Sequence, residues 1–263
     1  MAGEKSKERA ERHANPEAVA SKGAVCPAPC RKTRLACILV ALEVPALVAV
    51  PVVMVATAAA GLDATAGLTL LVAVLAVGLL FASFEASRPP LRQLMPTAVL
   101  GATAAAGRVL FAPITDVKPV SAIAIVAGAA LGRRSGFVVG AVAALVSNFF
   151  FGQGSWTPWQ MYAWGLVGYL GGVLADHGAL KRRGVLYGWG FISALMYGVI
   201  LNGYYVLGFV RPLTWPSVFA AYAAGALLDV VHGIATAAFL AAIWAPWGRA
   251  VRRVVAKYDL STR

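Results

Sequence analysis

The feature that most constrains the fold is a series of long apolar runs that recurs from residue 35 onward. A helix needs about 20 mainly apolar residues to span a lipid bilayer. Because 60% of the 263 residues are hydrophobic and only 13% are charged, the chain has too few polar groups to cover a water-facing surface. The sequence predicts an all-α, polytopic membrane helix bundle with eight spans: Leu35–Gly61, Leu68–Ala86, Leu94–Ala112, Val120–Leu131, Gly136–Phe151, Trp159–Ala175, Leu186–Phe209 and Pro216–Trp244.

The fourth run, Val120–Leu131, is short for a span. A run of about twelve residues must thin the bilayer, stay partly re-entrant or borrow length from the neighbouring loops. The ends of this helix are therefore less sharply defined by the sequence than those of the longer runs.

The basic residues predict the orientation. With the N-terminus in the cytoplasm and eight spans, twenty of the 23 Lys and Arg residues fall on the cytoplasmic side, and only Arg108, Lys118 and Arg211 lie on or near the outside. Such an asymmetry is what the positive-inside rule predicts. We expect a multi-pass protein of the cell membrane with both termini cytoplasmic. The net charge of +12 then reports topology, and we expect no nucleic-acid partner.

Polar stretches divide the chain into four parts. A basic N-terminal segment that carries Cys26 and Cys30 reads as a disordered cytoplasmic tail with free thiols. Two additional transmembrane helices and a linker follow, and then comes a six-helix membrane core. We place these parts, with a short cytoplasmic C-terminal tail, at residues 1–34, 35–93, 94–253 and 254–263.

Small residues form a row on the first helix of the core. Ala98, Ala102 and Ala106 are four residues apart, and Gly101 and Ala105 widen the strip. Such rows let helices approach closely in lipid, within one chain or between two. We read this row as a candidate partner-binding surface, with ordinary packing as the alternative. Two further pairs are assigned to ordinary packing: Gly136/Gly140 and Gly168/Gly172.

Two outward loops carry most of the candidate solute-binding residues. Aromatic rings beside amide donors suit a flat or ring-bearing solute, although tryptophans at this depth also serve as interfacial anchors. The loop between the third and fourth spans contributes Arg108 and Lys118. The loop between the fifth and sixth spans contributes Asn148, Gln153, Trp156, Trp159 and Gln160.

Deeper polar residues extend the candidate site. Asn202 and Tyr205 lie in the outer part of the seventh span, and Asp229 and His232 lie three residues apart near the middle of the eighth. Ionisable groups at membrane depth are costly and tend to be functional. The alternative is that Asp229 and His232 only satisfy each other or a neighbouring helix. Glu43 lies nearer the end of its span and receives no role.

Motifs for chemistry are missing from the sequence. It has no Walker A glycine loop, no zinc-binding His pair at helical spacing and no nucleophile elbow. We therefore predict a protein that is not an enzyme, has no cofactor and no metal, and binds a solute from outside without an energy source of its own.

This combination resembles the substrate-binding S components of energy-coupling factor (ECF) transporters. The resemblance covers residues 94–253 and lies in the alanine row, in Arg108…Phe111-Ala-Pro…Val117-Lys-Pro119 and in the loop Ser147–Met161. It implies that the alanine row docks on a shared transmembrane coupling subunit driven by two cytoplasmic ATPases. It also implies that a vitamin-like solute is held under the outer loops.

The two extra N-terminal helices depart from the usual six of that family, and could shield the coupling face or add a partner surface. The stretch Trp156-Thr-Pro-Trp-Gln-Met161 is similar to members linked with cobalamin or other large ring-bearing solutes. Two other functions stay open. One is a stand-alone, proton-coupled secondary transporter that uses Asp229 and His232, and the other is a non-transporting membrane enzyme or scaffold.

Overall fold

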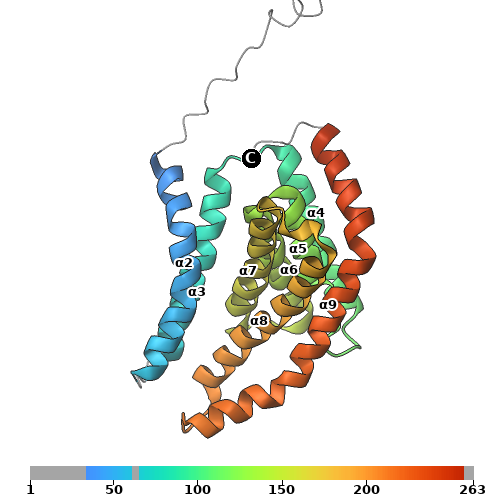
Figure 1. The fold of residues 1–263 in the computed structure, drawn as a ribbon. Coiled ribbons are helices and arrows are strands. Elements are labelled where there is room, and N and C mark those ends of the chain that lie inside the picture. The colour runs from blue at the N-terminus through green and yellow to red at the C-terminus, as the bar shows by residue number, and fades with distance from the viewer. Residues whose placement is uncertain (1–33, 61–64, 258–263) are drawn as a thin grey trace, which may run out of the picture. The chain divides into compact units, whose positions relative to one another are not determined.

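The computed structural model describes residues 34–60 and 65–257, and within them the chain is all helical. The N-terminal tail with Cys26 and Cys30, and residues 258–263 of the C-terminal tail, lie outside the described residues. The helices, shown in Figure 1, are α2 (Arg34–Ala59), α3 (Thr65–Ala86), α4 (Leu91–Leu110), α5 (Val120–Leu131), α6 (Arg133–Phe151), α7 (Trp156–Asp176), the short 3-10 helix η1 (Ala179–Lys181), α8 (Arg183–Phe209) and α9 (Trp215–Lys257).

The polytopic helical fold predicted from the apolar runs is confirmed. In the described part of the chain, α2, α3, α6, α8 and α9 are each long and apolar enough to cross a membrane by length and composition. The largest difference lies in α9, which continues past the expected end of its span at Trp244 to Lys257. The apolar run ends where charged residues begin, but charged residues do not end a helix that leaves the hydrocarbon layer.

The short helix α5 is a buried central element. Ten of its 12 residues are buried, between α4, α6, α7 and α9. A helix that is enclosed by protein need not match the thickness of the bilayer, because its backbone is satisfied internally and its surroundings are other helices. Its length follows from the sequence: Pro119 precedes its first turn, and Gly132 turns the chain into α6 with a φ of 94°.

Helices α6 and α7 approach each other closely through glycine. A Cβ at Gly136 or Gly168 would overlap backbone atoms of the opposite helix. The prediction that these glycines serve ordinary packing is therefore confirmed. Because the two backbones nearly touch, the C-terminal end of α6 lies beside the start of α7, where the candidate site is found.

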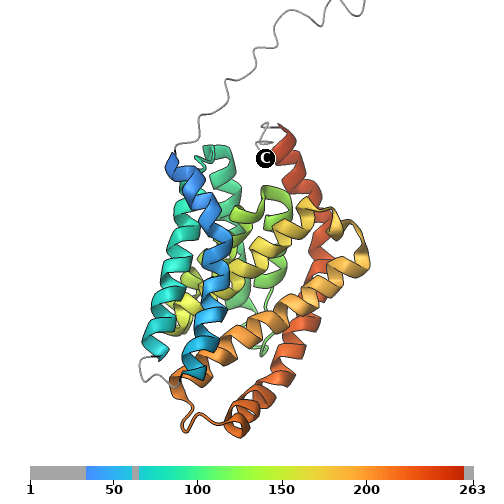
Figure 2. The same ribbon diagram turned by 60° about the vertical axis from the view of Figure 1, so that its left-hand side comes forward.

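Helices α2 and α3 lie side by side as a hairpin at one flank of the core, as Figures 1 and 2 show. The hairpin packs on α6, α7 and α8. Tyr162 of α7 donates a hydrogen bond to the Leu47 carbonyl of α2 at 2.6 Å, and both residues are buried. The hairpin is thus part of the packed bundle.

Glu43 provides a polar fastening between the hairpin and the core. Its carboxylate is only 1% exposed and accepts hydrogen bonds from Ser83 of α3 and from Arg134 of α6. Tyr169 of α7 donates to its other oxygen at 3.0 Å, and Arg133 lies 4.0 Å from that oxygen. The residue that the sequence left without a role therefore joins four helices.

Candidate functional site

The candidate site is built around Arg108, in the last turn of α4. The side chain is 7% exposed, and its Nη1 donates to Ser147 Oγ and to Asn148 Oδ1, each at 2.6 Å. Both acceptors belong to the last turn of α6. No carboxylate pairs with Arg108 in the part of the chain that the structure describes. A buried cation that is held by neutral groups alone retains unused attraction for an electron-rich ligand.

Aromatic rings flank the guanidinium. Its central carbon lies 4.6 Å from the ring centroid of Phe151 and 4.9 Å from that of Trp164. Trp164 stacks on Tyr197 of α8, with centroids 4.6 Å apart and planes 24° apart. Residues from α4, α6, α7 and α8 therefore meet in one column of planar groups.

An amide network extends from Asn148 into the start of α7. Asn148 Nδ2 donates to Gln160 Oε1 at 2.8 Å and to Thr157 Oγ1 at 2.9 Å. The Thr157 hydroxyl in turn donates to Gln153 Oε1 at 2.9 Å. The structure thus brings together Arg108, Asn148, Gln153 and Gln160, which the sequence analysis selected from two separate loops.

Several buried donors at this end of the bundle have no hydrogen-bond partner among the described residues. They are Arg108 Nε, Trp159 Nε1 and Trp164 Nε1. A buried donor without an acceptor costs about 1–3 kcal/mol, so native proteins rarely retain one without a reason. Donors beside ring faces suit a planar solute that carries carbonyl oxygens or ring nitrogens.

Tyr204 of α8 contacts two residues at the start of α7. Its ring lies 5.8 Å from Trp159, centroid to centroid, and its hydroxyl is 2.6 Å from Ser155 Oγ. Trp159 is only 1% exposed. The alternative of a lipid-facing anchor therefore does not describe Trp159, whereas Trp156, at 39% exposed, stays compatible with it.

Two other predicted site residues lie apart from this network. Lys118 forms an ion pair with Asp116 at 2.7 Å within the loop between α4 and α5. Tyr205 is 53% exposed and stacks on Phe209 of its own helix. In the described part of the chain, neither residue forms a hydrogen bond, ion pair or ring contact with Arg108 or Asn148, so their role as solute contacts stays a prediction.

Asp229 and His232 contact neighbouring helices instead of each other. Asp229 accepts a hydrogen bond from Asn202 of α8 at 3.1 Å, and His232 Nε2 lies 3.1 Å from Ser121 Oγ of α5. His232 also meets the Tyr197 ring edge-on, with centroids 5.3 Å apart. This arrangement matches the alternative in which each group satisfies an adjacent helix.

The alanine row lies on an open face of α4. Ala98, Ala102 and Ala106 are all exposed. Gly101 and Ala105 do not widen this strip, because both are buried and Gly101 faces Val142 of α6. Each of these two residues lies three positions after a member of the row. This spacing places it on a different side of the helix, which here faces the core.

Sequence reasoning missed Trp164 and Tyr197. A signal for Trp164 was present, since it follows Gln160 by four residues and so lies on the same face of α7. Tyr197 had no comparable signal, because its position under Trp164 depends on how α8 packs against α7.

The fold and these contacts define a multi-helix membrane protein with a buried polar and aromatic cluster at one end of its helices. A family model described as "ECF-type riboflavin transporter, S component" matches residues 91–247. The match spans more than half of the chain, and the protein belongs to this family of S components. The chain matches no curated protein and no solved structure. The matched region begins with α4, so the α2–α3 hairpin lies outside it.

Proposed function

We propose that this protein captures riboflavin, or a closely related flavin, at the extracytoplasmic side of the membrane. The observation that carries the proposal is the buried Arg108 guanidinium, which lies between Phe151 and Trp164 and keeps an unpaired Nε. The family description supports it by naming riboflavin.

The chemistry of a flavin fits the cluster. Its ring system is flat, so it suits ring faces such as those of Trp164 and Tyr204. Its carbonyl oxygens and ring nitrogens are acceptors, which match unpaired donors on Arg108, Trp159 and Trp164. The stacked and tilted aromatic pairs and the amide network hold these groups in place before a ligand arrives.

Cobalamin is less favoured. The stretch that suggested it runs from Trp156 to Met161, but Trp159 is buried against Tyr204 and Gln160 is bonded to Asn148. Two of the residues that suggested cobalamin are therefore engaged in contacts within the protein, and the family description names riboflavin instead. Family membership also favours a transport subunit over the proton-coupled carrier and over the enzyme or scaffold.

Uptake requires partners, which we propose are an ECF transmembrane coupling subunit and two cytoplasmic ATPases. The exposed row of Ala98, Ala102 and Ala106 is the proposed contact, because small side chains let a second helix approach closely. The sequence left two roles open for the α2–α3 hairpin: it shields the coupling face, or it adds a partner surface. Because the hairpin packs on α6, α7 and α8, we favour an added partner surface away from α4.

Direct titration tests the solute. The purified full chain in lipid nanodiscs is titrated with riboflavin while flavin and tryptophan fluorescence are followed, and cobalamin is titrated in parallel. We expect saturable binding of one riboflavin per chain and quenching of both signals. Binding of cobalamin with no binding of riboflavin would overturn the flavin assignment, as would binding of neither.

Substitution of Ala102 tests the coupling face. Ala102→Trp should leave riboflavin affinity within about twofold, because the Ala102 side chain is exposed whereas Arg108 is buried on another side of α4, but it should abolish uptake in cells that express the coupling module. The matched control is Val55→Trp on α2, which is 70% exposed and should preserve uptake. Equal loss of binding and uptake in Ala102→Trp contradicts the proposed division of labour.

A further inference from the structure

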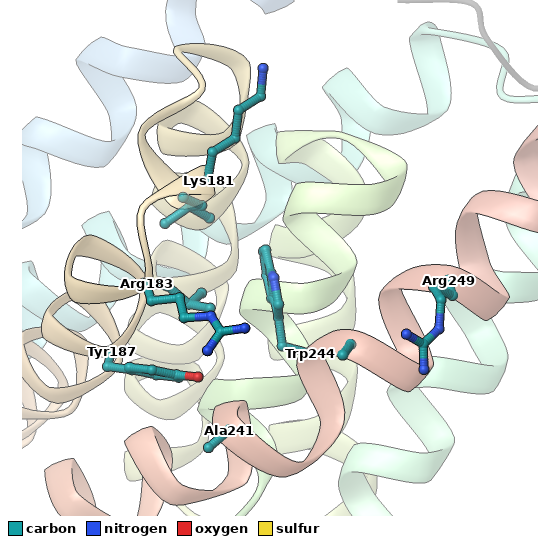
Figure 3. Close-up of a pocket in the computed structure, with 9 residues that line it drawn as sticks. Lys181, Arg183, Tyr187, Ala241, Trp244 and Arg249 are labelled. Carbon is teal, nitrogen blue, oxygen red and sulfur yellow. The ribbon is translucent and has the colours of Figure 1, made fainter.

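A basic cleft lies at the opposite end of the bundle from Arg108, where α7 ends and α8 begins. Its volume is about 470 Å³, and it is formed by η1, the start of α8 and the last third of α9. Figure 3 shows Arg183 and Tyr187 extending from α8 toward Trp244 of α9. On the predicted orientation, this cleft opens at the cytoplasmic surface of the membrane.

The cations of the cleft are not neutralised. Lys181, Arg183 and Arg249 line it, and none of them forms an ion pair within residues 34–60 and 65–257. The cleft also lies beside the N-terminus of the 27-residue helix α8, whose dipole adds positive potential. The charge of the cleft therefore matches an anion.

The remaining walls are apolar or aromatic. Leu180 and Leu186 are buried beneath the cleft, and Trp244 and Tyr187 supply rings of the kind that lie at the lipid headgroup level. A free phosphate ion would contact only the charged side of this space. A phospholipid would contact both sides, with its phosphate on the arginines and the first carbons of its acyl chains on the apolar wall.

We propose that this cleft binds the headgroup of an anionic phospholipid from the cytoplasmic leaflet. Basic pockets between transmembrane helices on this side of a membrane have the right charge and depth for such headgroups. The Arg183 guanidinium and the Tyr187 hydroxyl are the phosphate donors, and Arg249 adds charge at the rim. The site is separate from the flavin cluster, and neither proposal depends on the other.

Native mass spectrometry and lipid titration test the site. The full chain is titrated with phosphatidylglycerol and with phosphatidylcholine, and riboflavin binding is measured on the same samples. We expect a retained phosphatidylglycerol adduct and a clear preference over phosphatidylcholine. Arg183→Gln and Arg249→Gln should each weaken phosphatidylglycerol binding about fivefold, the effect expected for one basic contact near the membrane surface.

The matched control is Arg182→Gln, which removes the same charge one residue away from Arg183 but does not line the cleft. It should change lipid affinity by less than about twofold, and riboflavin binding should be unaffected in all three variants. Equal losses in Arg182→Gln and Arg183→Gln would show a general surface-charge effect and overturn the site. Displacement of the lipid by inorganic phosphate would assign the cleft to a soluble anion and overturn the lipid assignment.

Discussion

Two buried charges in this bundle have very different surroundings. The Glu43 carboxylate, 1% exposed, is held by Ser83 and Tyr169 and lies beside two arginines, Arg133 and Arg134. The Arg108 guanidinium, 7% exposed, has only neutral partners and keeps an unpaired Nε. One charge is fully matched by the protein and the other is not.

The difference separates a structural role from a binding role. A buried ion that is saturated by its own chain has little left to offer a ligand, and its removal exposes the partners that it neutralised. A buried ion with unpaired donors lowers the stability of the ligand-free protein. A ligand that supplies an acceptor recovers that free energy when it binds. Glu43 should therefore act on folding, and Arg108 should act on solute affinity.

The largest effect is expected for Glu43→Ala. Loss of one partner from a buried charge cluster costs about 3–5 kcal/mol, here because Arg134 and Arg133 lose their counter-charge. The measurement is the free energy of unfolding in detergent, by denaturant titration. The folded fraction should still bind riboflavin with affinity within about twofold.

The control for Glu43 is Glu85→Ala. Glu85 is an exposed carboxylate near the end of α3, and surface substitutions of this kind change stability by only about 0.5 kcal/mol. Similar stability losses in the two variants would contradict a fastening role for Glu43.

Arg108→Gln should have the next largest effect, and this effect should be on riboflavin binding. Truncation of a buried, hydrogen-bonded charge in an interface costs about 2–5 kcal/mol, so riboflavin affinity should fall at least about 30-fold. The free energy of unfolding should change far less than in Glu43→Ala, because no counter-ion is left behind. Isothermal titration and denaturant titration of the same preparation separate the two quantities.

Arg108→Lys sharpens the test. Lysine keeps the charge, but it loses the planar group that lies against the rings of Phe151 and Trp164, and it loses the Nε donor. It should therefore recover little of the lost affinity. Full recovery would assign the role of Arg108 to its charge alone.

Most of the fold could be predicted from the sequence, because lipid demands long apolar helices and leaves few alternatives. The helix Val120–Leu131 was found with the same ends, but its short length was ascribed to its fit in the bilayer. Its burial depends on contacts with several other helices, which no local pattern encodes. Glu43 was missed for the same reason, since its partners lie 40 to 126 residues away in the chain.

The candidate site was predictable where its residues lie near the ends of helices. Arg108, Asn148 and Gln160 stood out as polar groups beside broken helices, and the structure brings them together. Asp229 and His232 stood out as ionisable groups at membrane depth, and they contact Asn202 and Ser121, so their solute role stays a prediction. Trp164 lies in an apolar helix, where the sequence does not distinguish a ring that contacts a ligand from any other core residue.

Trp164→Phe tests whether that hidden ring contributes to binding. Phenylalanine keeps the stacking on Tyr197 but loses the unpaired indole donor and part of the ring face toward Arg108. The loss of one hydrogen bond is worth about 1 kcal/mol, and with the weaker ring contact we expect roughly tenfold lower riboflavin affinity. Trp215→Phe is the control, because Trp215 is 87% exposed, and its affinity should match that of the unchanged protein.

The smallest effect is expected for Tyr169→Phe, which mirrors Trp164→Phe at the other cluster. The substitution removes the hydroxyl that donates to Glu43 Oε2 at 3.0 Å and leaves the ring in place. Because Ser83 and Arg134 still donate to Oε1, and Arg133 remains 4.0 Å from Oε2, the free energy of unfolding should fall by only about 1 kcal/mol, with riboflavin affinity unchanged. A double variant with Glu43→Ala should be no less stable than Glu43→Ala alone, since the hydroxyl then has no carboxylate to bind. If the two losses of stability instead add in full, Tyr169 stabilises the bundle through a contact other than Glu43. The hairpin is then fastened to α7 by more than the Glu43 cluster.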